Sequence, residues 1–174
     1  MRFTLSLLLV ALGVVLRVAP HPLNFAPVGA IALFAGATFE NRRSAFLVPL
    51  VTMFIGDLFI GLHSLMPVIY ATYALIVILG MALRSRRRSV LAVGGAAIAS
   101  ATIFFIVTNF AVWLTLETYP LTLDGLAACY AAAIPFFDRT LASDLLFSAI
   151  FFGAFALAER RLDDAHRVAA SKRD

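Results

Sequence analysis

Ionisable, amide and aromatic side chains stand in or beside otherwise apolar segments of this chain, where charge is costly. An ionisable group at the centre of a membrane helix costs at least ~2.5–3.5 kcal/mol, so it normally faces a cavity or a partner. The candidate substrate-binding residues are Arg17, His21, Asn24, Asp57, His63, Tyr70, Tyr73, Asn109, Trp113, Tyr119, Arg139 and Asp144. Their polar groups would hydrogen-bond a small polar ligand, and their rings would form flat walls around it.

Motifs for covalent or metal catalysis are absent from the sequence. There is no HExxH, GxSxG or CxxC pattern, and no glycine-rich phosphate loop. His21 and His63 are only two side chains that could coordinate a metal ion, and two are too few to predict a metal site. Both could still contact a bound small molecule that itself carries a metal. His166 stands in a polar tail. We therefore expect no enzyme, no cofactor and no ATP hydrolysis by the chain itself.

The composition is typical of a polytopic membrane protein. Of the 174 residues, 62% are hydrophobic and 14% are charged, and the mean hydropathy is +0.96. A soluble domain has about 45–50% apolar residues, so this chain has too little polar surface for a soluble enzyme. Cys129 is the single cysteine, which excludes an internal disulfide. The net charge is +4. We interpret the excess of basic residues as the signal that orients a membrane protein, and we expect no nucleic-acid partner.

Six apolar segments are each predicted to be a transmembrane helix: Phe3–Val18, Asn24–Phe39, Ala45–Leu62, Met66–Leu83, Val90–Leu114 and Thr140–Glu159. About 20 residues are needed to cross ~30 Å of hydrocarbon, so the first two are short. The first is interpreted as a retained helix, because Val18-Ala19-Pro20 is a poor signal-peptidase site. The second is rich in small residues, including Gly36, which favours close helix packing.

The distribution of Lys and Arg sets the predicted orientation. With six alternating helices, twelve of the 14 basic residues fall on one side, and only Arg17 and Arg139 fall on the other. Basic loops remain cytoplasmic, so both termini are predicted to be inside. We expect one six-helix domain at residues 1–160 and a basic cytoplasmic tail at 161–174. The run Arg84–Arg88 then contacts anionic lipid of the bilayer.

Polar residues within the segments share one depth. Asp57, Asn109 and Asp144 each lie about five residues inside the predicted outer end of a segment, ~7–8 Å down. Asn109 and Trp113 lie four residues apart, on one helical stripe. This pattern predicts a polar chamber open to the outside above a dry inner half. The alternatives are hydrogen bonds between helices for the polar pairs, and an interfacial aromatic belt for Trp113 and Tyr119.

Residues Thr115–Arg139 are predicted to form a long outer loop that carries a short interfacial helix at Leu126–Ile134. A loop of this length above a polar layer favours a lid over a bound ligand. The alternative is a fixed cap that packs on the helices and never moves.

Several stretches resemble a bacterial family of small proteins assigned to transport: Pro20–Ala30 (PHPLNFAPVGA), Phe54–Gly61 (FIGDLFIG), Thr108–Trp113 (TNFAVW), Tyr119–Gly125, and Ala133–Phe137 (AIPFF) leading to Asp144. That family is similar to the substrate-binding S components of energy-coupling-factor (ECF) vitamin transporters. The resemblance implies an all-α bundle of six transmembrane helices, N-in and C-in, in the bacterial cytoplasmic membrane. It also implies a site near the outer face, under the loops after helices one, three and five.

The resemblance further implies partners. S components usually work with a coupling subunit and two ATPases. The Ala-xxx-Ala docking pattern of their first helix is not present here, so the protein could also act without these partners. Cobalamin is among the substrates left open, although segments three and four lack a cysteine ligand for cobalt. The sequence therefore predicts an uptake protein that binds a small water-soluble vitamin or cofactor precursor. The alternatives are a membrane-embedded enzyme with Asp57 or Asp144 as acid or base, and a structural subunit without ligand.

Overall fold

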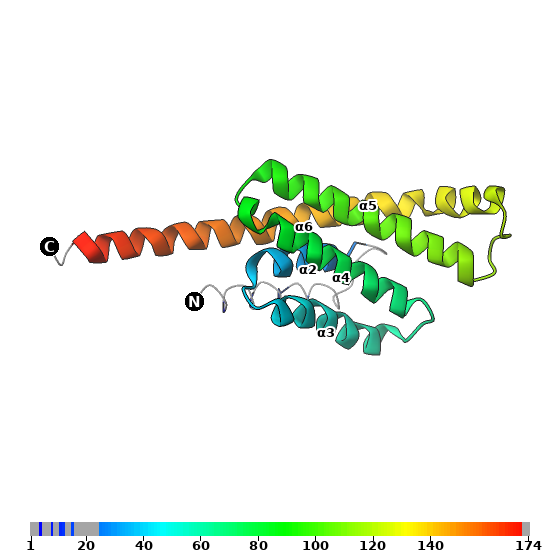
Figure 1. The fold of residues 1–174 in the computed structure, drawn as a ribbon, viewed down its shortest axis with the longest axis horizontal. Coiled ribbons are helices and arrows are strands. Elements are labelled where there is room, and N and C mark those ends of the chain that lie inside the picture. Colours follow the sequence, from blue (N-terminus) through cyan, green and yellow to red (C-terminus); the bar gives the residue numbers. More distant parts are fainter. Residues whose placement is uncertain (1–3, 5–7, 9–10, 13–14, 16–24, 172–174) are drawn as a thin grey trace.

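The computed structural model describes Thr4, Leu8, Ala11, Leu12, Val15 and the continuous stretch 25–171. Within these residues the protein is all-helical, with no β-strand. The helices are α2 (Val28–Thr38), α3 (Arg42–Ile60), α4 (Met66–Leu83), the 3-10 helix η1 (Arg84–Arg86), α5 (Val90–Thr115) and α6 (Leu123–Ser171) (Figure 1). The predicted segment Phe3–Val18 and the site residues Arg17, His21 and Asn24 lie outside the described residues, apart from isolated positions in the first.

Three of the described helical stretches are long and apolar enough to cross a membrane: Met66–Arg86, Val90–Thr115 and Leu123–Arg161. The predicted number of six is therefore not reached in this part of the chain. Helix α2 has 11 residues, which extend only ~16 Å. Helix α3 has Arg42 and Arg43 in its first turn and Asp57 close to its other end.

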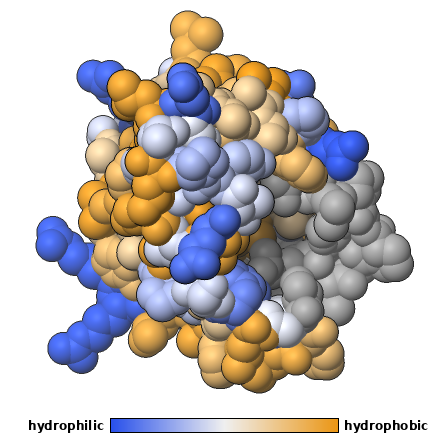
Figure 2. Space-filling view, turned by 90° about the vertical axis from the view of Figure 1, so that its right-hand side faces the viewer, coloured by the Kyte–Doolittle hydropathy of each residue, from blue (hydrophilic) through white to orange (hydrophobic). Residues whose placement is uncertain are grey.

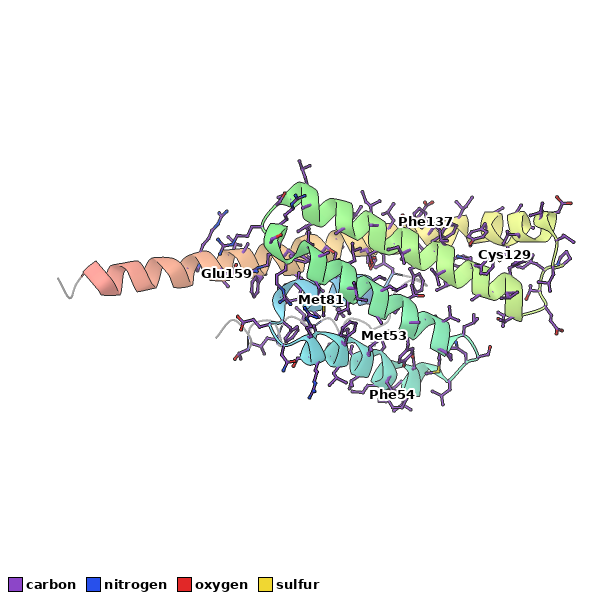
Figure 3. The ribbon with its side chains drawn as sticks, viewed as in Figure 1. Met53, Phe54, Met81, Cys129, Phe137 and Glu159 are labelled. Atoms are coloured by element: carbon purple, nitrogen blue, oxygen red, sulfur yellow. The ribbon has the colours of Figure 1, made fainter. Side chains whose placement is uncertain are left out.

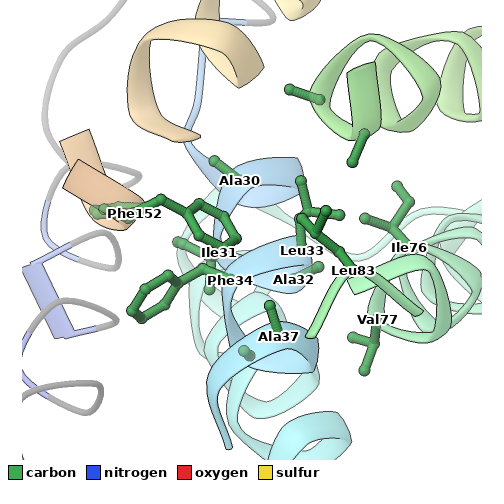
Figure 4. Close-up of a cluster of buried hydrophobic side chains, with 14 of the residues drawn as sticks. Ala30, Ile31, Ala32, Leu33, Phe34, Ala37, Ile76, Val77, Leu83 and Phe152 are labelled. Carbon is green, nitrogen blue, oxygen red and sulfur yellow. The ribbon is translucent and has the colours of Figure 1, made fainter. Parts of the chain in front are cut away.

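Helix α2 forms the centre of the bundle. Apolar or small residues surround its whole circumference, and a helix of this kind is stable only when it is buried on all sides. All its residues from Val28 to Ala37 are buried. Phe34 meets the rings of Phe151, Phe152 and Phe155 of α6 at centroid distances of 5.9, 5.3 and 5.6 Å. Ile76 and Val77 of α4 lie against the opposite side of α2 (Figure 4).

Two glycines bring α2 and α4 into backbone contact. A Cβ on Gly36 would overlap the carbonyl oxygen of Val77, and a Cβ on Gly80 would overlap the carbonyl oxygen of Leu33. Lipid is as apolar as the helix surfaces, so the hydrophobic effect does not drive helices together within a membrane. Small residues are common at membrane helix interfaces because they let the backbones approach closely and make dispersion contacts. The expected close packing through Gly36 is confirmed.

Helices α5 and α6 form a long antiparallel hairpin that extends beyond the α3–α4 turn (Figure 1). The prediction that Thr115–Arg139 is a loop with a separate interfacial helix is wrong. Only residues 116–122 connect the helices, and α6 runs unbroken from Leu123 through Pro135. Packing stabilises this extension: Tyr130 donates to the Ile106 carbonyl at 2.7 Å, and Phe105 stacks on Phe137 at 4.8 Å.

The two ends of the bundle differ in charge. The first turn of α3 contains Arg42 and Arg43, and it lies at the same end as the segment Arg84–Ser89 between α4 and α5. At this basic end, Glu159 of α6 is buried and binds Arg87 and Arg88 at 3.1 and 3.0 Å (Figure 3). The opposite end, called here the far end, contains the turns 61–65 and 116–122.

Candidate functional site

Asp144 is the most deeply buried carboxylate of the predicted site. It is 2% exposed, and it lies on α6 facing α5 and the start of α2. Ser100 of α5 donates its hydroxyl to Oδ2 of Asp144 at 2.8 Å, and the backbone N–H of Ala30 also donates to this carboxylate. Ser100 is ten residues beyond Val90 and Asn109 is nineteen, so Asp144 lies ~15 Å along α5 from its start, and Asn109 lies ~13 Å further on. The prediction that Asp144 and Asn109 share one depth above a dry inner half is therefore wrong.

The carboxylate of Asp144 caps the N-terminus of α2. The first N–H groups of a helix have no partner within the helix and carry a partial positive charge, which favours an anion beside them. Pro27, the cap residue, provides no side-chain hydrogen bond. A Cβ on Gly29 would overlap the carboxylate of Asp144. The absence of a side chain at Gly29 therefore leaves space for Asp144, which is remote in the sequence, to cap the helix.

The backbone before α2 is not helical, although it lies inside the bundle. Residues Phe25 and Ala26 are outside any helix. Ser143, next to Asp144 on α6, donates its hydroxyl to the carbonyl of Ala26 at 2.9 Å. Non-helical backbone at membrane depth is tolerated only where protein buries it or where it lines a watery cavity.

A second charged side chain closes the other end of α2. Arg84 donates from Nη2 to the carbonyl of Gly36 at 3.1 Å and to the carbonyl of Phe39. A cation at the C-terminus of a helix is favoured by the helix dipole. The short buried helix thus ends on a carboxylate at one terminus and on a guanidinium at the other.

Asp57 and Tyr70, both predicted site residues, form a second buried cluster. Tyr70 donates its hydroxyl to Oδ2 of Asp57 at 2.7 Å, and Asp57 is 5% exposed. Asp57 lies in the last turn of α3, and Tyr70 lies in the second turn of α4. The structure therefore brings these two predicted residues together toward the far end of the bundle.

Other predicted residues make contacts within the bundle. Tyr73 is buried and meets Phe104 of α5 at 5.2 Å. Asn109 donates its amide back to the Phe105 carbonyl of its own helix at 2.8 Å, and its own carbonyl accepts from Cys129 Sγ at 3.5 Å. Trp113 donates Nε1 to the Pro120 carbonyl at 3.0 Å, which fastens the α5–α6 turn.

The remaining predicted residues are not in these clusters. His63 is exposed in the α3–α4 turn, Tyr119 is half-buried in the α5–α6 turn, and Arg139 is exposed on α6. Viewed from the far end, a group of hydrophilic residues lies over the middle of the surface among hydrophobic ones, and further hydrophilic side chains project at its edges (Figure 2). Within residues 25–171 and the isolated described positions, no group of three His, Cys, Asp or Glu side chains is placed to hold a metal ion.

Sequence reasoning assigned no role in the site to Gly29, Ser100, Ser143 or Arg84. Gly29 and Arg84 resemble an ordinary small helix residue and an ordinary loop cation when read in sequence. Their roles come from contacts with residues far away in the chain. The available signal was an aspartate within an apolar segment, which must have a partner.

The described residues are all-helical, and three of their helical stretches are long and apolar enough to cross a membrane, which is consistent with a helical membrane protein. The chain belongs to the family of unknown function DUF6580, whose model matches residues 1–168. No curated protein and no solved structure gives a significant match to the chain.

Proposed function

We propose that this chain is a membrane substrate-binding protein for the uptake of a small water-soluble nutrient, a vitamin or cofactor precursor. The proposal includes a six-helix arrangement, N-in and C-in, in the bacterial cytoplasmic membrane, with a binding site that opens toward the far end. The likeness to ECF S components belongs to the same proposal. So does a choice of partners between a coupling subunit with ATPases and solitary action.

The observation that carries the proposal is the short, buried helix α2. A helix of 11 residues ends inside the bundle on the buried Asp144, and non-helical backbone precedes it. Many transporters place their substrates at discontinuous helices, where helix ends and unwound backbone offer unpaired polar groups. Asp57 and Tyr70 add a carboxylate and a phenol toward the far end, and Tyr73 adds a ring.

The orientation is tested by cysteine labelling on a Cys129→Ser background. Ser64 and Ser85 are both exposed, and they lie at the far end and the basic end respectively. We expect an impermeant thiol reagent to label Ser64→Cys in intact cells, and to label Ser85→Cys only after the membrane is opened. The reverse pattern would contradict both the orientation and an outward-facing site.

Ligand binding is tested with Asp57→Asn. Purified protein is incubated with a small-molecule extract of the cells that express it, washed, and its retained compounds are identified by mass spectrometry. A hydrogen bond to a charged group contributes ~1.5–3 kcal/mol. We therefore expect the variant to retain at least about tenfold less of the compound than the unmodified protein, with its unfolding temperature nearly unchanged. Asp124→Asn, at an exposed carboxylate of α6, is the matched control and should retain the compound. A protein that retains no compound above the extract background, or equal retention by both variants, would argue against this function.

A further inference from the structure

A groove of about 480 Å³ opens between the first turns of α5 and the facing stretch of α6 at the basic end. Its apolar wall consists of Val90, Gly94, Leu145, Phe152, Gly153 and Leu157. A Cβ built on Gly94 or on Gly153 would meet nothing within 4 Å. These glycines therefore keep the groove open.

The groove lies on helical stretches that are long and apolar enough to cross a membrane, where lipid would surround it. Both helices that form it belong to the apolar stretches Val90–Thr115 and Leu123–Arg161. Val90 and Leu157 are 86% and 60% exposed on its walls. Exposed aliphatic side chains of this kind pack against acyl chains.

The rim of the groove is cationic. Arg87, Arg88 and Arg160 line it, and Glu159 between them is the partner of the first two. Among the side chains that the structure describes, three guanidinium groups and one carboxylate lie at the mouth, which gives these groups a net positive charge. Arginine binds phosphate through several parallel donors, and basic pockets between helices at the cytoplasmic side bind anionic lipid headgroups.

A buried polar atom also lines the groove. Ser148 is 1% exposed, and its hydroxyl has no hydrogen-bond partner in the part of the chain that the structure describes. Leaving a buried hydroxyl unpaired costs free energy, and such groups are normally satisfied by protein, water or ligand. The glycerol esters below a lipid phosphate offer carbonyl acceptors of the kind that this hydroxyl lacks.

We propose that the groove binds one anionic phospholipid, with its phosphate at the arginine rim and an acyl chain along Gly94 and Gly153. Charge at the mouth together with an apolar wall matches this occupant better than it matches a free anion, which would leave the wall uncovered. It also matches better than a zwitterionic lipid, whose headgroup carries no net charge. The inference does not depend on the nutrient site, because no residue that lines the groove is among the proposed nutrient-binding residues.

The test is native mass spectrometry of the detergent-purified full chain, titrated separately with dioleoyl-phosphatidylglycerol and dioleoyl-phosphatidylcholine. We expect the unmodified protein to bind the anionic lipid at least fivefold more tightly. Arg160→Gln should weaken its binding about fivefold, the change that corresponds to ~1 kcal/mol per basic residue at a membrane surface. Arg161→Gln is the matched control, because Arg161 is exposed but does not line the groove, and it should change binding less than twofold.

Shape is tested by Gly94→Leu, with Gly95→Leu as its control. Both positions have open space around a Cβ, but only Gly94 lines the groove. We expect Gly94→Leu to lose the tightly bound lipid and Gly95→Leu to keep it, with both proteins unfolding at similar temperatures. Equal affinity for the two lipids, or equal effects of the two leucine variants, would overturn the proposal. A change in oligomeric mass with unchanged lipid binding would instead assign the groove to a second copy of the chain, and would also overturn it.

Discussion

Replacing Asp144 with alanine is expected to lower the free energy of unfolding by about 2–4 kcal/mol. The substitution removes the acceptor of the Ser100 hydroxyl and of the Ala30 N–H, both deep in the bundle. Each buried donor left without a partner costs ~1–3 kcal/mol. The change also removes the carboxyl group that caps the N-terminus of α2, where the first N–H groups have no partner within the helix.

Two matched variants make this prediction specific. Asp138→Ala removes an exposed carboxylate from the same helix and should change the stability by no more than ~0.5 kcal/mol. Asp144→Asn keeps an acceptor for Ser100 and should fall between the two alanine variants. The measurement is reversible unfolding of purified protein in mixed micelles, followed by circular dichroism. An Asp144→Ala protein as stable as Asp138→Ala would show that the α2 cap contributes nothing.

Gly80→Ala and Gly36→Ala are each expected to destabilise the protein, by about 1–3 kcal/mol or more. One methyl group at either position would overlap a backbone carbonyl oxygen of the facing helix. Backbone atoms cannot move aside as a side-chain end can, so α2 and α4 must separate along their whole contact. Overpacking of a well-packed core typically costs ~1–3 kcal/mol.

Gly95→Ala provides a control that predicts the opposite sign. Its added methyl group meets nothing within 4 Å, and alanine is favoured over glycine within a helix by ~0.5–1 kcal/mol. Gly95→Ala should therefore leave the stability unchanged or raise it, while Gly36→Ala and Gly80→Ala lower it in the same unfolding assay. If all three variants behaved alike, the close approach of α2 to α4 would not be a determinant of the fold.

The apolar pattern alone predicted most helices closely. Met66–Leu83 is observed with the predicted bounds, and Val90 begins α5 as expected. These agreements follow from local chemistry: Ser89 caps α5 through the Ala92 N–H at 3.3 Å, and Pro67 lies in the first turn of α4, where proline is tolerated. Hydropathy did not distinguish Met53 from Phe54 in α3, since both are apolar, although Met53 is buried and Phe54 is 48% exposed (Figure 3).

The end of the fifth segment misled the sequence interpretation. Polar residues and prolines between Thr115 and Arg139 indicated a loop, yet only a short turn separates α5 from α6. Proline within a helix removes one hydrogen bond and is tolerated when neighbouring contacts replace it. Here the contacts of α5 with Tyr130 and Phe137 stabilise the helix around Pro135, and such contacts between distant residues cannot be detected from hydropathy.

The sequence by itself determined that this is an apolar helical protein, that most of its basic residues lie outside the apolar segments, and that Asp57 and Asp144 must have partners inside it. Those properties depend on transfer free energies of individual residues, which add along a segment. Tertiary structure alone decided which partners those are and where α2 ends. Asp144 caps α2 only because Gly29 leaves room for it, and Arg84 closes the other end only because α4 packs against α2 through Gly36 and Gly80. Such caps act over a few ångströms between residues remote in the chain, so only the packed bundle specifies them.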